Sequence, residues 1–506
     1  MNSNIKSKLK SYISRSNTIF MSVLVIILFA SIGAYITLTS SAATADADFN
    51  NDSMVNILDL SILASNWSKT SMFHSQGDAN ADGTVNIIDL SILANYFGQT
   101  VSITPTPTGQ PANSINVKDA PYSVKGDGTT DDTASLNSAF VASASQSKIA
   151  WVPSGTYKFS SLVLPDNLTI QGEGVAMTYL NGQVNFGSNQ FIYDLKMGTY
   201  GNSTRNKNGA NNTLFERVQF RGGGGSAGGT SAPVMYIGQR NVATNITFIN
   251  CNWECSLGSD PSPFGNCYNC ITIQSTSDSP SLVVDGILFQ DCHIGVSNGV
   301  RSGSLRFGLE VVNSTSGSSG LIKNITLRNC IVEAADAESI DFSDHPNPSA
   351  RMTGLLIEDC LIKGGGKAYG IYAFSVVFEL PYGFIFRNNT VWRSPDTVLK
   401  MTQRDETYPV DEAAVITGNN FDLEYDNGIV PGTNYAIQLM RSNVQFTGNT
   451  ISSPSSGYSN NGIIRLREMT DSTINHNTAN ILGRTFIFED KSTGSSGNII
   501  TPNTVN

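Results

Sequence analysis

The segments "IEDCLI" (357–362), "FRNNTV" (386–391), "ITGNNF" (416–421), "FTGNTI" (446–451) and "INHNTA" (474–479) repeat one pattern along the chain. Their starting positions are separated by 29, 30, 30 and 28 residues. Three earlier segments share the pattern: "LRNCIV" (327–332) begins 30 residues before the first of these, and "FQDCHI" (289–294) and "FINCNW" (248–253) precede it at wider spacings of 38 and 41 residues. Each unit consists of an apolar strand, a polar turn centred on Asn or Asp, and a second apolar strand.

This repeat decides the fold class. A period near thirty residues without helical periodicity predicts one coil of a parallel β-helix, in which each coil buries its apolar positions against its neighbours. Asn suits the turn because it tolerates left-handed backbone geometry and its amide can stack between coils. A β-sandwich would place strands and hairpin turns every eight to twelve residues, and it does not explain the thirty-residue phase.

The start of the repetitive region matches a known superfamily. "GDGTTDDTASLNSAF" (126–140) and "WVPSGTYKFSSLVLPDNLTIQGEG" (151–174) resemble the opening of the pectate-lyase-like, right-handed parallel β-helix superfamily. The resemblance implies an all-β domain over residues 115–506 that handles carbohydrate, often acidic polysaccharide, along one outer face. The superfamily includes lyases, hydrolases, phage tailspikes and non-catalytic binders. We interpret Asp127, Asp131 and Asp132 as turn and cap residues.

A second repeat lies upstream, where "ADFNNDSMVNILDLSILASNW" (47–67) is repeated as "GDANADGTVNIIDLSILANYF" (77–97). Oxygen ligands at fixed loop positions followed by a short helix predict two Ca²⁺ sites of the EF-hand type. The Leu60, Leu63 and Ala64 face should pack on the Leu90, Leu93 and Ala94 face. The predicted ligands are Asp48, Asn50, Asp52, Met54 (carbonyl), Asn56 and Asp59 in the first loop, and Asp78, Asn80, Asp82, Thr84 (carbonyl), Asn86 and Asp89 in the second.

This duplicated loop and helix resembles a dockerin, over Asp48 to Phe97. The resemblance implies a calcium-dependent module that docks onto a cohesin-like protein. Dockerins of the best-known type carry a hydroxyl pair at loop positions 10 and 11. This chain has Ile57-Leu58 and Ile87-Ile88 there.

The N-terminal region indicates export. Basic residues precede a twenty-residue apolar run, Ile19 to Leu38, which is long enough to span a bilayer and which also fits a cleaved signal. We therefore predict a flank and signal or transmembrane helix (1–44), the calcium module (45–100), a Pro/Thr linker (101–114) and the β-helix (115–506). The location should be extracellular or at the cell surface. The net charge of −10 argues against a nucleic-acid partner.

The cysteines fall into two groups. Cys251, Cys292, Cys330 and Cys360 occupy one phase of the repeat and should form a buried ladder. The insertion that follows the first of them holds three more, for which we expect a Cys255–Cys267 disulfide. Four sulfurs, at 251, 255, 267 and 270, would also suit zinc.

Stacking the strands that follow each turn predicts an outward column of Glu310, Asp341, Tyr372, Lys400, Gln438 and Arg465. We expect Asp341 and Glu310 to be the catalytic pair, with Asp344 and His345 beside them, because two close carboxyl groups separate an acid from a base. We expect substrate contacts from Tyr372, Lys400, Arg404, Arg441, Arg465 and Arg467.

Two functions fit this column. The first is a polysaccharide lyase or O-glycosyl hydrolase, in which basic residues hold a uronate carboxylate or two carboxyl groups cleave a neutral glycan. The second is a non-catalytic glycan-binding or adhesive surface protein, which the absence of the polygalacturonase and pectate-lyase signatures favours.

Overall fold

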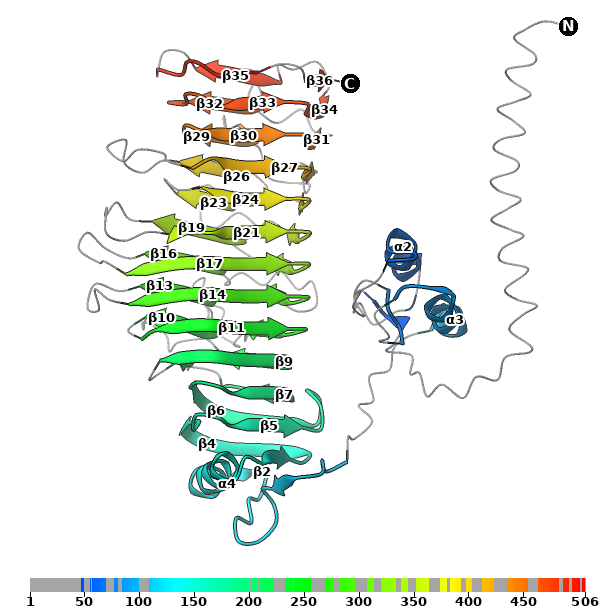
Figure 1. Ribbon diagram of the computed structural model, residues 1–506, viewed down its shortest axis with the longest axis vertical. Coiled ribbons are helices and arrows are strands. Elements are labelled where there is room, and N and C mark those ends of the chain that lie inside the picture. The colour runs from blue at the N-terminus through cyan, green and yellow to red at the C-terminus, as the bar shows by residue number, and fades with distance from the viewer. Residues whose placement is uncertain are drawn as a thin grey trace, which may run out of the picture. The chain divides into compact units, whose positions relative to one another are not determined.

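The computed structural model (Figure 1) divides the chain into two compact units, Met1–Thr104 and Pro105–Asn506. Within the residues described, no helix is both long and apolar enough to cross a membrane. The apolar run Ile19 to Leu38 and the predicted signal or transmembrane helix lie outside them. The structure describes residues 47–49, 55, 57–69, 77–80, 84–99, 109–199, 203–206, 209–222, 233–239, 241–255, 269–275, 282–295, 307–313, 320–333, 338–344, 352–363, 374–379, 383–392, 397–402, 412–422, 435–453, 463–481, 486–490, 494–500 and 503–505.

The first unit contains the two helices that the calcium-loop repeat predicts, α2 (Ile57–Ser65) and α3 (Ile87–Tyr96). Leu63, Ile92 and Leu93 are buried in its small core, with Leu60 and Leu90 packed against it. The expectation for Ala64 and Ala94 is wrong, because both side chains are exposed. Ile92, one position before Leu93, is buried in the core instead.

The second unit is a parallel β-helix, as its stacked coils in Figure 1 show. The strand pairings are all parallel, and they join strands to their equivalents one coil away, which gives three long ladders. An additional pairing between sheets joins Tyr179 and Leu180 to Lys196 and Met197. Sheet 1 consists of β2 (Asp127–Asp131), β4 (Gly155–Val163), β6 (Thr178–Phe186), β8 (Thr204–Asn206), β10 (Met235–Gln239), β13 (Asn269–Ser275), β16 (Phe307–Asn313), β19 (Ile340–Asp344), β23 (Phe374–Glu379), β26 (Thr397–Thr402), β29 (Ile437–Met440), β32 (Ile464–Arg467) and β35 (Ile487–Asp490).

Sheets 2 and 3 complete each coil. Sheet 2 consists of β1 (Ser114–Asn116), β3 (Ile149–Val152), β5 (Thr169–Gly172), β7 (Phe191–Met197), β9 (Ala210–Gly222), β11 (Ala243–Ile249), β14 (Val283–Gln290), β17 (Leu321–Arg328), β20 (Met352–Thr353), β21 (Leu355–Glu358), β24 (Phe384–Arg387), β27 (Ala414–Thr417), β30 (Val444–Thr447) and β33 (Thr473–Asn475). Sheet 3 continues from the end of β9 through β12 (Asn252–Cys255), β15 (His293–Gly295), β18 (Ile331–Glu333), β22 (Leu361–Lys363), β25 (Thr390–Trp392), β28 (Asn420–Asp422), β31 (Thr450–Ser453), β34 (Thr478–Ile481) and β36 (Thr504–Val505).

The corner between sheets 2 and 3 explains the repeated sequence. Its first residue has a positive φ in every repeat, for example 56° at Asn388 and 67° at Gly418. Asn, Asp and Gly tolerate this left-handed conformation better than other residues. The residue that follows points into the core and belongs to a ladder of Cys251, Cys292, Cys330, Cys360, Asn389, Asn419, Asn449 and Asn477.

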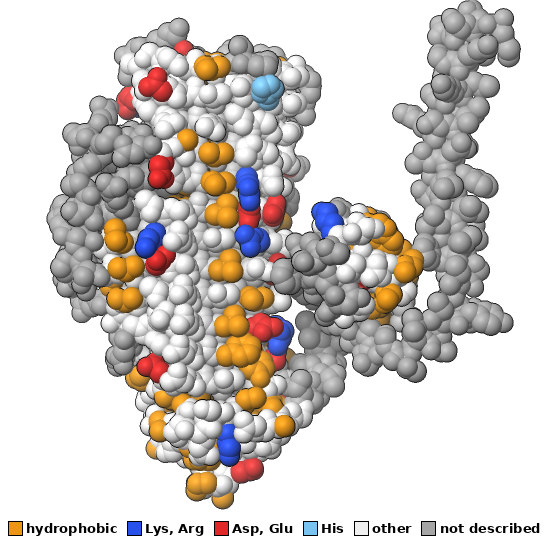
Figure 2. Space-filling model, in the orientation of Figure 1, with side chains coloured by type: hydrophobic (Ala, Val, Ile, Leu, Met, Phe, Trp, Pro, Cys, Tyr) orange, Lys and Arg blue, Asp and Glu red, His pale blue; other side chains and the backbone are white. Residues whose placement is uncertain are grey.

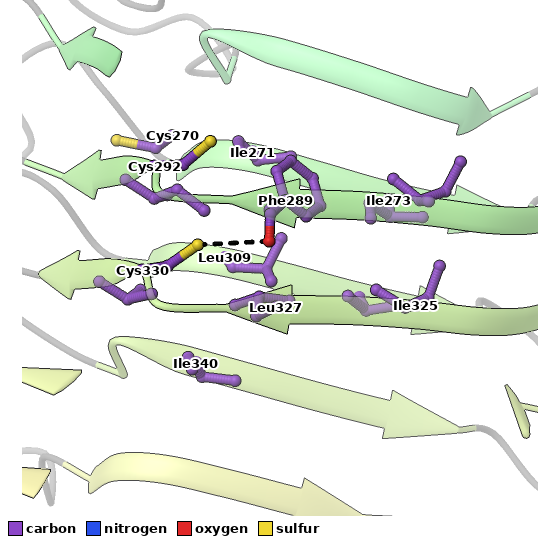
Figure 3. Close-up of a cluster of buried hydrophobic side chains, with 14 of the residues drawn as sticks. Cys270, Ile271, Ile273, Phe289, Cys292, Leu309, Ile325, Leu327, Cys330 and Ile340 are labelled. Atoms are coloured by element: carbon purple, nitrogen blue, oxygen red, sulfur yellow. Dashed lines mark hydrogen bonds between the residues drawn. The ribbon is translucent and has the colours of Figure 1, made fainter. Parts of the chain in front are cut away.

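The cysteine part of this ladder consists of free thiols, as predicted. Cys251, Cys270, Cys292, Cys330 and Cys360 are buried and form no disulfide. In Figure 3 Cys330 lies beside Phe289, to whose carbonyl oxygen its Sγ donates at 3.4 Å. Cys267 and the side chain of Cys255 lie outside the described residues, so the proposed disulfide stays a prediction.

The asparagine part of the ladder is held by hydrogen bonds between coils. Asn419 Oδ1 accepts from the backbone N–H of Asn389 at 2.9 Å and from its Nδ2 at 3.0 Å. Asn419 Nδ2 donates to the Phe386 carbonyl at 2.9 Å. Because these polar groups are buried, each of them needs its partner. The same pattern recurs at Asn449 and Asn477.

Helix α4 (Thr133–Ser145) contacts the first coils through its buried Leu136, Ala139 and Phe140. The preceding acidic residues hold the turn that leads into it. Asp132 accepts from the backbone N–H groups of Lys125 (2.8 Å) and Gly126 (3.0 Å). Asp131 accepts from the N–H of Thr133 at 3.0 Å. These contacts agree with the interpretation of both residues as structural.

Candidate functional site

Strand register places the predicted carboxyl pair on one outward column of sheet 1. Glu310 on β16 is the register partner of Asp341 on β19. Adjacent parallel strands lie about 4.8 Å apart, so the two side chains start from neighbouring positions on the same face. This part of the prediction agrees with the pairing of the strands.

The Glu310 carboxylate is held from the preceding coil. Asn269 Nδ2 donates to Glu310 Oε2 at 2.6 Å, and Thr272 Oγ1 approaches the same oxygen at 3.3 Å. Asn269 Nδ2 also lies 2.9 Å from Thr272 Oγ1. Two donors that converge on one oxygen suit an ionised carboxylate and fix its orientation.

The Asp341 side chain lies in a different environment. Burial disfavours its charged form and raises its pKa to about 7. The hydroxyl of Ser343, which donates to Asp341 Oδ1 at 2.7 Å, opposes this shift, whereas the negative charges of Glu338, Glu310 and Glu379 add to it. A carboxyl group with a pKa near neutrality can both give and take a proton.

A second outward column runs beside the first. Ser343 is the register partner of Glu379 on β23. Glu379 Oε1 lies 3.8 Å from Lys400 Nζ on β26. Lys400 therefore stands near a carboxylate of its own protein, two strands away from Asp341.

The column continues past Glu310 toward the N-terminal coils, where sequence analysis did not find it. Thr272, Tyr236 and Arg205 occupy successive positions. The Arg205 guanidinium lies 5.5 Å from the centre of the Tyr236 ring. Burial raises the pKa of Tyr236, the positive charge of Arg205 lowers it, and the negative charge of Glu310 raises it again. An aromatic ring and a cation thus lie on the same face as the carboxyl pair.

The prediction for Tyr372 is wrong in register. Val377 is the residue that pairs with Asp341 on one side and with Lys400 on the other. Val376, the residue before Val377, pairs with Ile340 and is buried in the core. Tyr372 itself lies outside the described residues, as do His345, Arg404 and the side chain of Asp344.

Three of the arginines predicted to contact substrate are described by the structure, and they occupy different kinds of position. Arg465 continues the outward column, and its guanidinium lies 5.3 Å from the Tyr435 ring centre. Arg467 pairs with Glu468 at 2.8 Å. The prediction that Arg441 contacts substrate is wrong, because its side chain is buried and its Nη2 donates to the Glu412 carbonyl at 2.6 Å. Burial lowers its pKa to about 10.

The described residues of the two predicted calcium loops have the oxygen donors that a calcium ion requires. The carboxylates of Asp48, Asp59, Asp78 and Asp89 are all buried in the small first unit. Asp89 accepts from the N–H groups of Ala79 and Asn86 at 2.8 and 2.7 Å. So many buried carboxylates in a module of this size fit a divalent cation, whose charge would compensate theirs. Among the described residues, no three acidic, histidine or cysteine side chains lie close enough together to hold a metal ion.

Of the other predicted calcium ligands, the structure describes only Asn80, Thr84 and Asn86. Asn86 caps α3, because its Oδ1 accepts from the Ile88 N–H at 2.8 Å and its Nδ2 donates to the Thr84 carbonyl at 3.1 Å. Asn80 donates its backbone N–H to Asp89. Asn50, Asp52, Met54, Asn56 and Asp82 lie outside the described residues.

Comparison with protein families adds to this geometry. Residues 46–98 match the dockerin type I domain. Residues 114–315 match the family described as rhamnogalacturonase A/epimerase, pectate lyase-like. The chain carries a dockerin type I domain followed by a pectate-lyase-like domain. Both resemblances found in the sequence are confirmed. No curated protein sequence matches the chain.

Solved structures resemble the β-helix only distantly. A mannuronan C-5 epimerase module of Azotobacter vinelandii is 15% identical, with a TM-score of 0.44 over 78% of this chain and 99% of that one. An α-1,3-glucanase of Streptomyces thermodiastaticus is 14% identical (TM-score 0.47; 81% and 71%). A surface adhesin of Streptococcus pneumoniae is 16% identical (TM-score 0.47; 78% and 91%). At these values the likenesses carry no argument about a reaction.

Proposed function

We propose that the pectate-lyase-like domain is a glycoside hydrolase that cleaves polysaccharide on the outward face of sheet 1. The observation that carries this proposal is the pairing of Asp341 and Glu310 on adjacent strands, together with the raised pKa of Asp341. A pectate-lyase-like β-helix joined to a dockerin domain supports a carbohydrate-active protein in general.

The two carboxyl groups divide the chemistry. Asp341, protonated below pH 7, gives its proton to the glycosidic oxygen as the carbon–oxygen bond breaks and the leaving sugar departs as an alcohol. Glu310, held as a carboxylate by Asn269 and Thr272, attacks the anomeric carbon or takes a proton from the water that does. The configuration of the first product distinguishes these two routes.

The surroundings favour hydrolysis over β-elimination. Elimination from a uronate needs a cation beside the base, to neutralise the carboxylate next to the proton that leaves. Among the described residues, Asp341 has two register neighbours: Glu310 on one side and the buried Val377 on the other. Lys400 lies one strand further and approaches Glu379. The site is therefore acidic at its centre, as hydrolysis by two carboxyl groups requires.

Groups on either side of the pair would bind the glycan. Tyr236 offers an aromatic surface for a sugar ring two strands before Glu310, and Arg205 lies next to it. Lys400 and Arg465 lie on the other side. Cations at both ends of an acidic centre would suit a polysaccharide with uronate residues on either side of the cleaved bond and none at the bond itself.

The dockerin domain suits an extracellular or cell-surface enzyme. Dockerin type I domains bind Ca²⁺, and two ions would fit the two loops of this chain. Calcium at extracellular concentrations would keep such loops occupied. We propose that a cohesin-like partner holds the enzyme near its substrate and that the N-terminal segment directs its export.

A depolymerisation screen over pectic, alginate-like and neutral glycans tests the proposal. New reducing ends without unsaturated uronate indicate hydrolysis, whereas unsaturated ends indicate a lyase. Asp341→Asn and Glu310→Gln should each lower kcat about a hundredfold or more. Asp422→Asn, the matched change on the outward side of sheet 3, should leave kcat unchanged. Wild-type turnover by Asp341→Asn would contradict the assignment of this site.

The second candidate function is that of a non-catalytic glycan-binding protein. In the same column the uncharged Val377 adjoins Asp341, and the uncharged Gln438 lies between Lys400 and Arg465; such neutral positions would suit a binding face. Retardation of the wild-type protein in glycan-containing gels, without any product, would support this function over hydrolysis.

A further inference from the structure

A row of mainly apolar side chains runs along the outer side of sheet 2, and Figure 2 shows hydrophobic residues gathered in a line along the β-helix. The strand pairings place one residue of each coil in this row, beside its equivalents in the coils before and after. We call the six central residues of the row the sheet 2 stripe. They are Leu214, Thr247, Leu288, Thr326, Leu356 and Ile385.

The stripe is straight and regular. From Leu214 to Leu356, a leucine occupies every second coil and a threonine occupies each coil between. Adjacent parallel strands lie about 4.8 Å apart, so the leucines recur at intervals of roughly 10 Å. Phe191 precedes the stripe in the same row, and Val415 follows it. The outer side of sheet 2 therefore carries an apolar surface that is one side chain wide and at least six coils long.

These side chains are not part of the core of the β-helix. Phe215 and Phe248, each the next residue on its strand, are buried there instead. The leucines and threonines of the stripe are half-buried, and Ile385 is 38% exposed. Beside the start of the stripe, the Phe191 ring stacks on the Tyr193 ring with 4.5 Å between their centres. Contiguous exposed apolar groups of this kind commonly mark a binding surface.

Polar side chains border the stripe on both sides. On one side Lys323 Nζ lies 3.0 Å from Asp285 Oδ2. On the other side Glu358 accepts hydrogen bonds from Arg328 Nε at 2.6 Å and from Arg387 Nε at 2.8 Å. Along β17, Lys323 comes three residues before the stripe and Arg328 two residues after it. Because acidic and basic groups pair within each border, the borders offer hydrogen bonds more than a net charge.

An extended glycan has the matching arrangement of polar and apolar groups. In a β-linked hexose chain the two faces of each ring present C–H groups, and the hydroxyl groups project from the ring edges. A chain that lies along the coil axis would place ring faces on the stripe and hydroxyl groups beside both polar borders. Burial of the ring faces removes apolar surface from water, and the hydroxyl groups keep hydrogen-bond partners.

We propose that the sheet 2 stripe binds an extended, neutral, β-linked polysaccharide that lies parallel to the coil axis. The compensated charges on both sides of the stripe favour a neutral chain over a uronate chain. This face is distinct from the outward face of sheet 1, which carries Asp341 and Glu310, and the proposal does not depend on the reaction proposed there. A chain bound on sheet 2 would hold the protein on a fibre while sheet 1 acts on another chain.

A second copy of the protein fits the stripe less well. Stable protein interfaces bury a compact area of about 800 Å² on each partner, with an apolar centre and a polar rim. The stripe is narrow and long, and its polar borders run along its whole length. A linear ligand matches this outline better than a folded partner does.

The test measures adsorption of the full-length protein to suspended cellulose, mannan and xylan, in the cold and with calcium present. One variant combines Leu288→Gln with Leu356→Gln. The row accepts glutamine, because Gln445 occupies a later coil of it. We expect the wild type to adsorb to at least one of the three glycans and the variant to adsorb about tenfold more weakly. The matched control, Ile331→Gln with Leu361→Gln on the outward side of sheet 3, should adsorb like the wild type.

Amylose and pectate separate the proposed ligand from other glycans. Amylose is neutral but α-linked and coiled, whereas pectate is charged. If either of them binds the protein elsewhere, the stripe variant should bind it as the wild type does. A loss of amylose or pectate binding as large as the loss of cellulose, mannan or xylan binding would overturn the assignment to a neutral, extended, β-linked chain.

Footprinting of the wild type decides the matter even if the variant does not fold. Hydroxyl-radical labelling of Leu288 and Leu356 should fall when the protein is adsorbed, and labelling of Ile331 and Leu361 should not. Unchanged labelling of the leucines overturns the proposal. So does a wild type that adsorbs to none of the three glycans, or a variant with the wild-type melting temperature and undiminished adsorption. Dimerisation of the wild type that the variant loses would assign the stripe to a second copy and also overturn it.

Discussion

The charge on Asp341 is costly to the folded protein. Its pKa in the folded chain is about 7, whereas an aspartate in an unfolded chain titrates near 3.9. The folded state therefore holds a proton that the unfolded state has released between about pH 4 and pH 7. In that window stability falls as pH rises, with a limiting slope of about 1.4 kcal/mol per pH unit for a single group.

Asp341→Asn removes this dependence because an amide stays neutral. We expect the melting temperature of the variant, relative to the wild type, to rise between pH 4 and pH 7 and to level off above. Thermal scans at several pH values measure the difference. A constant difference across this range would show that the carboxyl group titrates near its ordinary pKa.

The same titration predicts the dependence of activity on pH. If Asp341 is the general acid, kcat/KM should decline above pH 7, where the carboxyl group loses its proton. The profile of Glu310→Asp, which keeps a carboxylate at reduced reach, should decline at a similar pH with a lower maximum. A profile that is flat from pH 5 to pH 9 would contradict the acid role.

Asn419 illustrates what one ladder side chain contributes to stability. Asn419→Ala would leave the Asn389 N–H and the Phe386 carbonyl without the partners that they have in the wild type. Each buried group left unsatisfied costs about 1–3 kcal/mol, so we expect a loss of about 3 kcal/mol in unfolding free energy. Asn420→Ala, at the exposed neighbouring position, should cost far less. Denaturant titration compares the two.

Sequence alone could predict the ladder because one geometric requirement recurs in every coil. The left-handed corner is Asn, Asp or Gly in every repeat but the last, which has His476. The buried position after it is always Cys or Asn, so the phase of the repeat can be seen without a structure. The register of β23 was not visible in this way. "GIYAFSVVF" (370–378) alternates acceptably in two registers, and an odd shift exchanges the inward and outward sides of a strand.

At the scale of elements, α2 and α3 are too short to be stable alone. Their loops carry buried carboxylates whose repulsion a divalent cation would relieve. We expect chelation to unfold residues 46–98 and calcium to restore their helices. Asp78→Ala or Asp89→Ala should weaken calcium binding more than Asp48→Ala or Asp59→Ala, because the first loop has Ser53 where the second has Gly83. Circular dichroism of the 45–100 fragment during a calcium titration measures both effects.

The elements that sequence analysis missed are β8, β10 and β13, which carry Arg205, Tyr236 and Thr272. The insertions in the early coils, such as "RGGGGSAGGT" (221–230), vary in length and hide the thirty-residue phase. A usable signal was present in the short alternating runs "VMYIG" (234–238) and "CITIQ" (270–274). Aligning their inward residues would have placed Tyr236 and Thr272 outward.

For the whole molecule, the two compact units should respond differently to calcium. The β-helix is held by a continuous apolar core and by ladder hydrogen bonds, whereas the dockerin domain depends on its loops. Calorimetry in chelator should therefore remove a low-temperature transition and leave the main one in place. A shift of the main transition by several degrees would show that calcium also stabilises the β-helix.

Thiol labelling reports on the same main transition. The five cysteines whose side chains the structure describes are buried in the core of the β-helix, and burial raises the pKa of the Cys292 and Cys360 thiols. Protonated, inaccessible thiols do not react. We expect an alkylating reagent to leave these cysteines unmodified in the native protein and to modify them together on unfolding, as peptide mass spectrometry would show.

The asparagine ladder also makes the length of the protein adjustable. Each link from Asn389 to Asn419 and from Asn419 to Asn449 spans thirty residues and has the same donors and acceptors at both ends. An engineered chain that lacks residues 419–448, or that repeats them, would present identical groups at the new junction. The acidic pair lies several coils away and would keep its surroundings. Such chains would form a series of enzymes that share one reaction centre and differ, coil by coil, in how much of a long glycan they can hold.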